Sequence, residues 1–277
     1  MEITSVQNPR VKAAARLREW RGRQEQDRII IDGLRETSRA VEAGLAIWEL
    51  FYVEELCRDA QHAALLERAA AGGIELVAVG PRVMEKLAYG NRVEGVVAIA
   101  GTPRRGLADL PLAADALVAV VEGIEKPGNL GAILRTADAA CIAAMIVADG
   151  GTDLYNPNAI RASLGAIFTV PVCEATSDQT LAWLRASGFR ILAARVGAQL
   201  EYSQADYRGR TAIVLGSEAH GLGSHWLGPD ITPISLPMLG RVDSLNLSAA
   251  AAVLFYEALR QRRLRAGNGP SGQPAHG

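Results

Sequence analysis

The chain lacks several features that would place it at once in a known class. It has no apolar run of about 18 residues and no signal-peptide pattern at its start, so its sequence predicts neither membrane insertion nor export. It also lacks the GxGxxG fingerprint and the Gly-Lys-Ser/Thr ending of a P-loop, which disfavours nucleoside triphosphate hydrolysis. We therefore expect a soluble, cytoplasmic protein with no membrane partner.

Cysteine and histidine are scarce. The three cysteines, Cys57, Cys141 and Cys173, are odd in number, widely spaced and set among apolar residues. This pattern suits neither a disulfide framework nor a zinc site, and we expect all three to be small core residues. The four histidines show no metal-ligand spacing, so no metal site is predicted.

Basic residues are numerous, but acids almost balance them. The net charge at pH 7 is −1, and all but three of the 29 basic residues are arginine. Local patches matter more than the total. The densest patch lies near the start of the chain and consists of Arg10, Lys12, Arg16, Arg18, Arg21, Arg23 and Arg28.

This patch has the pattern of a short amphipathic helix with a basic outer face, because Val11, Ala14 and Leu17 recur at helical spacing. The face either contacts nucleic-acid phosphates or is an ordinary solvated surface, and both interpretations stay open. The phosphate-binding candidates are Arg10, Lys12 and Arg16. A second basic cluster at 260–265 ends the last predicted helix and is interpreted as structural.

Strand-like apolar runs alternate with helical patterns along most of the chain, which predicts two α/β domains. A break rich in Gly, Pro and Arg over Gly101–Leu112 separates them. The predicted organisation is a first domain over 1–103, a linker over 104–114, a second domain over 115–265 and a disordered tail over 266–277.

The runs in the second domain are continuously apolar, which predicts a parallel sheet covered by helices on both faces. Its expected strands are Ala116–Glu122, Ala144–Ala148, Phe168–Val172, Arg190–Val196, Thr211–Gly216 and Ile231–Leu236. In the first domain the expected strands are Ile29–Ile31, Ile47–Val53, Ile74–Val79 and Val96–Ala100, with helices near Arg35–Ala43, Ala60–Ala71 and Pro81–Leu87.

Three glycine-containing segments follow strands of the second domain: Pro127–Ala139, Val214–Gly223 and Ser235–Val253. An open parallel sheet binds ligands beyond the carboxyl ends of its strands, so we expect all three at that edge. In the first segment, a tight turn at Gly128, Asn129 and Gly131 is predicted before a helix over 132–140 that carries Arg135. A surface ion pair between Arg135 and Asp138 is the alternative interpretation of this arginine.

The second and third segments bring further polar groups to the same edge. Gly216 permits a close approach of a flat ligand, and Glu218 either serves a ligand or caps the turn that follows. His220, between glycines and without a serine nucleophile signature, is interpreted as a loop side chain. Ser244 is a candidate cap for a helix starting near Leu247, whereas Asn246 is expected to bond a ligand or a neighbouring loop.

The order and spacing of Asn129 and Arg135, then Glu218, then Ser244 and Asn246 resemble the three signature motifs of the SpoU/TrmH-like RNA 2'-O-ribose methyltransferases. The resemblance covers about 115–263, and 156–172 is similar to the segment that joins the first two motifs. Residues 1–100 resemble, less specifically, the family's substrate-recruiting domain, which has a ribosomal-protein-like fold. The resemblance implies a deep trefoil knot, a homodimer and S-adenosyl-L-methionine as the cofactor.

By the same resemblance, the cofactor pocket consists of Leu215, Gly216, Gly221, Ile234, Leu236, Met238, Leu245 and Asn246. The catalytic set implied is Arg135, Asn129, Glu218, Ser244 and Asn246. Arg135 would bind the ribose-phosphate and lower the pKa of the 2'-hydroxyl, because a guanidinium with a pKa above about 12 is a poor base. Asn129 and Glu218 would position Arg135. Whether a phosphate oxygen or a neutralised Arg135 accepts the proton stays open.

The expected substrate is ribosomal RNA rather than transfer RNA, because a separate recruiting domain is predicted. Two alternatives remain: a noncatalytic RNA-binding or ribosome-assembly protein that keeps the fold, and an unknotted Rossmann methyltransferase acting on a small molecule. Two apolar departures from the family pattern are visible. Cys141-Ile142-Ala143 stands where a glycine-containing turn is common, and Leu239 stands where a small residue is frequent.

Overall fold

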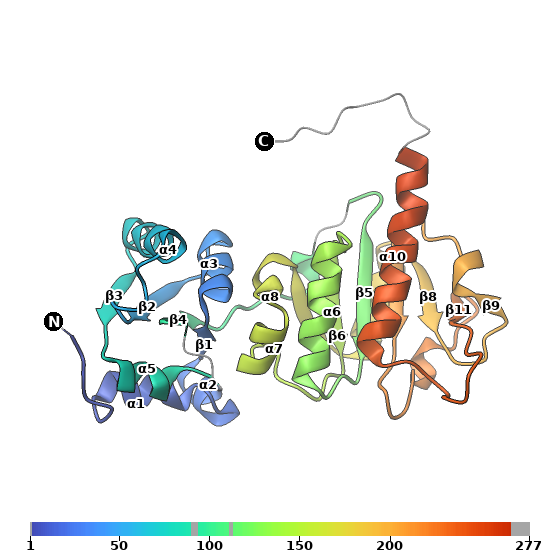
Figure 1. Cartoon of the computed structure of the whole chain (residues 1–277). Coiled ribbons are helices and arrows are strands. Elements are labelled where there is room, and N and C mark those ends of the chain that lie inside the picture. The colour runs from blue at the N-terminus through green and yellow to red at the C-terminus, as the bar shows by residue number, and fades with distance from the viewer. Residues whose placement is uncertain (1, 90–93, 111–112, 267–277) are drawn as a thin grey trace. The chain divides into compact units, whose positions relative to one another are not determined.

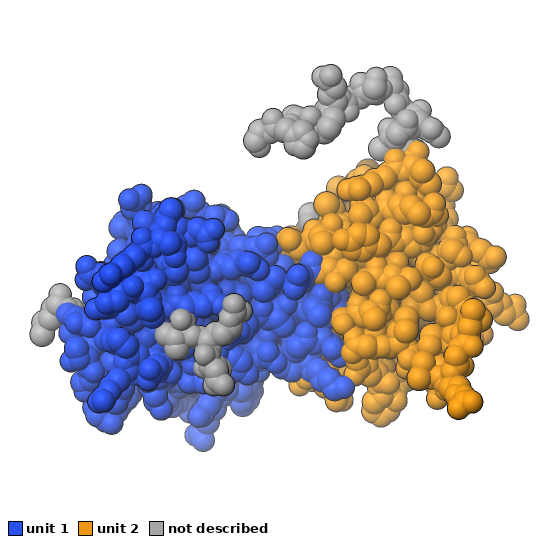
Figure 2. All heavy atoms as spheres, viewed as in Figure 1, with its two compact units in different colours: residues 1–104, 126–135, 152–169 blue, residues 105–125, 136–151, 170–277 orange. Residues whose placement is uncertain are grey.

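A computed structural model describes residues 2–89, 94–110 and 113–266 (Figure 1). The predicted disordered tail beyond residue 266 lies outside the described residues. The chain forms two compact units, coloured separately in Figure 2. The first unit contains 1–104, 126–135 and 152–169, and the second contains 105–125, 136–151 and 170–277.

The first unit is built on a four-stranded sheet of order β1-β4-β2-β3. Its strands are β1 (Arg28–Asp32), β2 (Ile47–Tyr52), β3 (Glu75–Ala78) and β4 (Val96–Gly101). Strand β4 is antiparallel to β1 and β2, and β2 is parallel to β3. The four strands and the helices α3 (Leu34–Glu42), α4 (Ala60–Ala71) and α5 (Pro81–Leu87) agree with the prediction.

The predicted amphipathic helix is two helices, α1 (Pro9–Arg16) and α2 (Trp20–Gln26). Val11, Ala14 and Leu17 are buried in one core with strand residues such as Phe51, as their spacing predicts. The chain turns between the helices because Gly22 packs against the end of α1. A Cβ atom on Gly22 would lie 2.0 Å from the carbonyl oxygen of Arg16.

The second unit contains a seven-stranded sheet of order β7-β6-β5-β10-β8-β11-β9, in which all pairs are parallel. Its strands are β5 (Leu117–Glu122), β6 (Ala144–Ala148), β7 (Val172–Ala175), β8 (Arg190–Ala194), β9 (Leu200–Glu201), β10 (Thr211–Leu215) and β11 (Ile231–Ser235). Every residue of β5, β6 and β10 is buried, so the prediction of a parallel sheet covered on both faces is confirmed.

The predicted strand over Phe168–Val172 is wrong. Residues Ala166–Thr169 form helix α8, which follows α7 (Pro157–Ala162), and the strand begins only at Val172. Local hydrogen bonds from the amides of Ala166 and Phe168 close the helical turn. Pro171 lacks an amide proton for a ladder and so delays the strand.

Helix α6 (Pro127–Ala139) passes from the first unit into the second. The predicted tight turn at Gly128–Gly131 is wrong, because these residues are already helical. Pro127 suits the first helical position, where no amide hydrogen bond is needed. Gly131 serves a packing contact: a Cβ atom there would lie 2.5 Å from the Cβ atom of Ala162 on α7.

Two longer helices complete the second unit. Helix α9 (Ser177–Ala186) packs Leu181 and Leu184 into the core of the sheet, together with Trp226 from a short 3-10 turn, η3 (Ser224–Trp226). Helix α10 (Leu247–Ala266) buries Ala251, Leu254, Phe255 and Ala258 at helical spacing. The other 3-10 turns are η1 (Leu107–Asp109) and η2 (Tyr202–Gln204).

Cys141 is exposed, which corrects the prediction that all three cysteines are core residues; Cys57 and Cys173 are buried. Cys141 ends α6 in the left-handed region, with φ at 56°. The amide of Ile142 donates to the carbonyl of Ala137 at 2.9 Å, as in a glycine-type helix cap. A glycine at this turn, common in the family that the sequence resembles, would adopt the same conformation without a Cβ penalty.

We expect Cys141→Gly to stabilise the protein by about 0.5–1 kcal/mol, because glycine adopts the left-handed region without a Cβ penalty. Urea unfolding would measure the change. Cys141→Ala is the matched control, since it removes the sulfur and keeps the Cβ atom. An equal gain in both variants would assign the effect to the thiol instead.

Asp32 is a buried carboxyl at the end of β1. Its Oδ2 accepts from the amide of Tyr89 at 2.7 Å and from Arg161 Nη1 at 3.5 Å. Burial raises the pKa of Asp32 from 3.8 to about 6, against the opposing effects of these two donors. A raised pKa in the folded state means that Asp32 supports folding below about pH 4 and loses that contribution as the pH rises through about 6.

We therefore expect Asp32→Asn to gain stability relative to the wild type by about 1 kcal/mol between pH 5 and pH 7.5. Asparagine keeps an acceptor for the amide of Tyr89 and carries no charge at either pH. Urea unfolding of both proteins at the two pH values measures the change. A difference that does not vary with pH would refute this role.

Candidate active site

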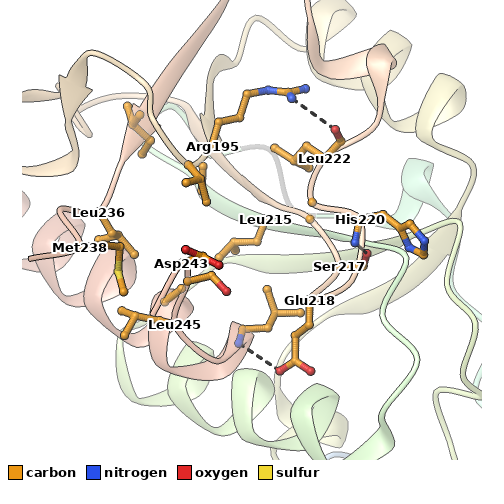
Figure 3. A pocket seen from close by; sticks show the side chains of 18 residues that line it. Arg195, Leu215, Ser217, Glu218, His220, Leu222, Leu236, Met238, Asp243 and Leu245 are labelled. Atoms are coloured by element: carbon orange, nitrogen blue, oxygen red, sulfur yellow. Dashed lines mark hydrogen bonds between the residues drawn. The ribbon is translucent and has the colours of Figure 1, made fainter. Parts of the chain in front are cut away.

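A cavity of about 470 Å³ opens at the carboxyl ends of β8, β10 and β11, which are neighbours in the sheet (Figure 3). It lies wholly within the second unit. Among the residues that line it are all the predicted cofactor-binding residues except Asn246: Leu215, Gly216, Gly221, Ile234, Leu236, Met238 and Leu245. Glu218 and Ser244, both predicted to be catalytic, line it as well.

One wall is the loop that follows β10, residues 216–223, here called the β10 loop. It folds back on itself: the amide of Ser217 donates to the carbonyl of Gly221 at 3.2 Å, and the reverse bond measures 3.0 Å. The side chain of Ser217 also accepts from the amide of His220 at 3.1 Å. Gly221 has a φ of 64° and tolerates the left-handed turn.

The fold of the β10 loop itself requires Gly216. A Cβ atom at this position would lie 2.1 Å from the carbonyl carbon of Gly221, so glycine permits a close approach of the chain here. The turn forms part of the wall of the cavity, because Gly216, Ser217 and Gly221 are among its lining residues. The shape of the β10 loop therefore depends on the absence of a side chain at Gly216.

Glu218 connects the β10 loop to the start of α10. Its Oε1 accepts from Asn246 Nδ2 at 2.7 Å and from the amide of Leu247 at 3.4 Å. Asn246 Oδ1 in turn accepts from the amide of Ser248 at 3.0 Å. Asn246, rather than Ser244, thus caps α10, and its amide group bonds the neighbouring loop as its sequence position predicts.

Asn129 and Arg135 lie on α6, in the part of that helix that belongs to the first unit. Asn129 is partly buried, and Arg135 is exposed. The two are six positions apart along the helix, with Asn129 in the first turn. The structure thus brings Glu218, Ser244 and Asn246 together in one unit and places Asn129 and Arg135 on one helix.

Three residues near the cavity were missed by the sequence interpretation: Glu122, Arg195 and Asp243. Arg195 and Asp243 line the cavity (Figure 3). Glu122 ends β5 and is buried. A charged residue at the carboxyl end of a buried strand was a signal available in the sequence for Glu122 and Arg195, since ligands bind at that edge.

Part of the basic patch near the start of the chain is neutralised by ion pairs. Arg10 forms ion pairs with Glu49 at 2.9 Å and Glu75 at 2.8 Å, and Arg16 pairs with Glu25. Lys12 is exposed.

Arg23 does not belong to a solvated face at all. It is 3% exposed, pairs with Asp153 at 2.7 Å and donates to the carbonyl of Leu17 at 2.7 Å. A phosphate could not reach Arg23 without breaking these contacts. The prediction that Arg23 belongs to a basic outer face is therefore wrong.

Two arginines of the basic cluster at the end of α10 have structural partners. Arg260 pairs with Glu257 at 2.8 Å. Arg262 donates to the carbonyls of Tyr207 at 2.9 Å and Gly209 at 2.7 Å, and so ties the helix to the loop before β10.

Within the described residues, no group of three or more His, Cys, Asp or Glu side chains is arranged to hold a metal ion. Among the described residues, no helix combines the length and the apolar character that a membrane crossing requires.

A parallel sheet with a cavity beyond the ends of adjacent strands defines an α/β protein that binds a small organic ligand at its strand-end edge. The chain belongs to the SpoU rRNA methylase family, whose family model matches residues 116–256. Residues 8–98 match a second model, the MRM3-like substrate binding domain.

Relatives with established names support this membership. The chain is 30% identical over 264 residues to the 23S rRNA (uridine(2479)-2'-O)-methyltransferase of Streptomyces viridochromogenes, with 90% of each chain covered. A crystal structure of an RNA 2'-O ribose methyltransferase is 39% identical, with a TM-score of 0.82 over 95% of this chain and 100% of that one. An AdoMet-bound rRNA methyltransferase from Sinorhizobium meliloti is 27% identical, with a TM-score of 0.85 over 94% and 97% of the two chains.

We expect Gly216→Ala to destabilise the protein by about 1–3 kcal/mol, because the added methyl group overpacks the β10 loop. Chemical denaturation of purified protein would measure this loss. Gly240→Ala is the matched control, since a Cβ atom at Gly240 would meet nothing within 4 Å. Equal stability of the two variants would contradict the geometry of the loop.

Proposed function

We propose that the protein transfers a methyl group from S-adenosyl-L-methionine to a ribose 2'-hydroxyl of ribosomal RNA. The observation that carries this proposal is the cavity, because residues selected from the sequence as cofactor-binding line it within the region that matches the SpoU family. Relatives named as 23S rRNA 2'-O-methyltransferases support ribosomal RNA as the substrate class.

The cavity fits such a cofactor. Its volume lies in the range of small-molecule pockets, about 300–1,000 Å³. Leu215, Ile234 and Leu236 would supply apolar walls for an adenine ring, and the β10 loop lines the cavity beside them. The bound cofactor would supply an electrophilic methyl group on a sulfonium.

Arg135 is proposed to bind the ribose-phosphate of the substrate. A guanidinium has a pKa above about 12 and five donors in a fixed fork, so it acts as a charge rather than a base. Held beside the 2'-hydroxyl, it would lower the pKa of that hydroxyl and so favour the nucleophilic oxygen. Asn129, on the same helix, is proposed to orient it.

Glu218, from the second motif, and Ser244 and Asn246, from the third, are proposed to shape the site. The bonds from Asn246 and Leu247 to Glu218 support this role, because they join the β10 loop to the first turn of α10. Glu218 is also proposed to help position Arg135. Ser244 lines the cavity and is proposed to keep its loop in place.

Residues 1–103 are proposed to recruit RNA through a ribosomal-protein-like fold, and 115–265 to carry out the transfer, with 104–114 as the linker. The match of 8–98 to a substrate binding domain supports the first part. Lys12 and Arg16 are exposed candidates for phosphate contact. Arg10 and Arg16 now pair with carboxylates, and on RNA binding each would pair with a phosphate instead.

The trefoil knot, the homodimer and the cytoplasmic location belong to the same proposal. Family membership supports the knot. Exposed apolar residues in the last part of the chain support a covering second copy: Leu239 is 98% exposed, Val242 63% and Tyr256 51%. The absence of a helix that meets the criteria for a membrane span among the described residues is consistent with the location.

The chemistry predicts that Arg135→Ala abolishes 2'-O-methylation while the protein stays folded. Primer extension on 23S rRNA treated with each protein would map the methylated sites, and circular dichroism would monitor the fold. Arg82→Ala is the control, since Arg82 is exposed on α5, outside the motifs. Unchanged turnover in Arg135→Ala would remove the assigned role.

Two further measurements separate the alternatives. In calorimetry, a noncatalytic protein that keeps the fold would show no S-adenosylmethionine binding. A transfer RNA enzyme would methylate a tRNA transcript and leave ribosomal RNA unmodified.

A further inference from the structure

Gly223, the last residue of the β10 loop, is held through both of its backbone polar groups. Its amide donates to Glu122 Oε2 at 2.7 Å. Its carbonyl accepts from Arg195 Nη2 at 2.8 Å, and the carbonyl of Leu222 accepts from Arg195 Nη1 at 3.3 Å. Glu122 ends β5 and Arg195 follows β8, and these strands flank β10 in the sheet. The loop is therefore held from both neighbouring strands.

Both oxygens of the Glu122 carboxylate accept hydrogen bonds. Its Oε1 accepts from Ser177 Oγ at 2.8 Å and from Trp226 Nε1 at 2.9 Å, while Oε2 accepts from Gly223. Glu122 is 9% exposed, and Ser177 and Trp226 are 1% exposed. A carboxylate removed from water needs such donors, so its orientation is fixed by three partners from three different elements.

The contacts of Glu122 affect the cavity indirectly, through the β10 loop. Gly221 and Leu222, the two residues before Gly223, line the cavity. Arg195 lines it too, and Figure 3 shows its guanidinium directed at Leu222. Glu122 is not among the described residues that line the cavity, so it acts on a ligand there only through the loop.

We propose that Glu122 and Arg195 are positioning residues that hold the β10 loop in its cofactor-binding conformation. This role rests on the proposed function, because it takes the cavity as the S-adenosylmethionine site. It assigns to Glu122 an effect on cofactor affinity rather than on the chemical step.

Glu122→Gln tests this with almost no change of volume. One side-chain oxygen becomes an NH₂ group, which can no longer accept. If that group faces Gly223, two donors oppose each other and the loop loses its anchor. If it faces Ser177 and Trp226, it opposes the indole N–H of Trp226. The amide of Trp226 donates to the carbonyl of Gly223, so the end of the loop is disturbed in this arrangement as well.

Calorimetric titration of S-adenosylmethionine into full-length Glu122→Gln is expected to give a Kd about tenfold higher than that of the wild type. In methylation of ribosomal RNA, KM for S-adenosylmethionine should rise similarly, while kcat at saturating cofactor stays within about twofold. Wild-type affinity in the folded variant, or a loss confined to kcat, would overturn the role.

Ser177→Ala is the matched control, because it removes one donor from the same carboxylate and leaves the bond to Gly223. Its Kd should stay within about twofold of the wild type even where its stability falls. An equal loss of affinity in both variants would reduce the effect to general destabilisation and overturn the proposal. If the wild type itself binds no S-adenosylmethionine, the proposed function fails, and this role fails with it.

Arg195→Lys provides a second variant that should fold, since Arg195 is only partly buried. Lysine keeps the positive charge beside the cavity but cannot reach two carbonyls with a planar fork. We expect the Kd for S-adenosylmethionine to rise severalfold in this variant. Unchanged affinity would overturn the proposal even if Glu122→Gln did not fold.

Discussion

The parallel pairing of β10 between β5 and β8 is the constraint on which the candidate site depends. Val214 pairs with Val120 on one side and with Ala193 on the other. This register brings the ends of three strands to one edge, where their loops form the cavity and its supports. Strands β6 to β9 lie between β5 and β10 in sequence, so the pairing of β10 with β5 joins two segments that are far apart along the chain. A change that displaces β10 would therefore disturb every part of the site together.

Elements with a strong local signal could be predicted from the sequence, and elements fixed by packing could not. The continuous apolar runs of β5 and β10 predict buried parallel strands, and the structure confirms them. Gly131 resembles a turn residue, yet it serves the contact of α6 with Ala162. The run after Phe168 resembles a strand, yet local helical bonds and Pro171 delay the strand. The contact of Gly131 is tertiary and invisible to periodicity, whereas Pro171 is visible in the sequence and marks where the strand can begin.

The same distinction applies to the site. The residues that line the cavity lie within compact motifs, so spacing and resemblance could select them. Glu122 could not be selected in this way, because its bond to Gly223 spans 101 residues of sequence. The close approach at Gly216 is likewise a property of the folded β10 loop, although the glycine itself is visible. The motifs thus select residues that line the cavity, and the fold shows which bonds Glu122 makes to support them.

The uneven burial of the three thiols has a practical consequence for studying α6 in solution. Burial raises the pKa of Cys57 and raises that of Cys173 to about 11, so both react slowly with electrophiles at neutral pH. Cys141 is exposed at the end of the helix that carries Arg135. A maleimide fluorophore should therefore attach there selectively in the unmodified protein, and would report on the surroundings of α6 when RNA is added.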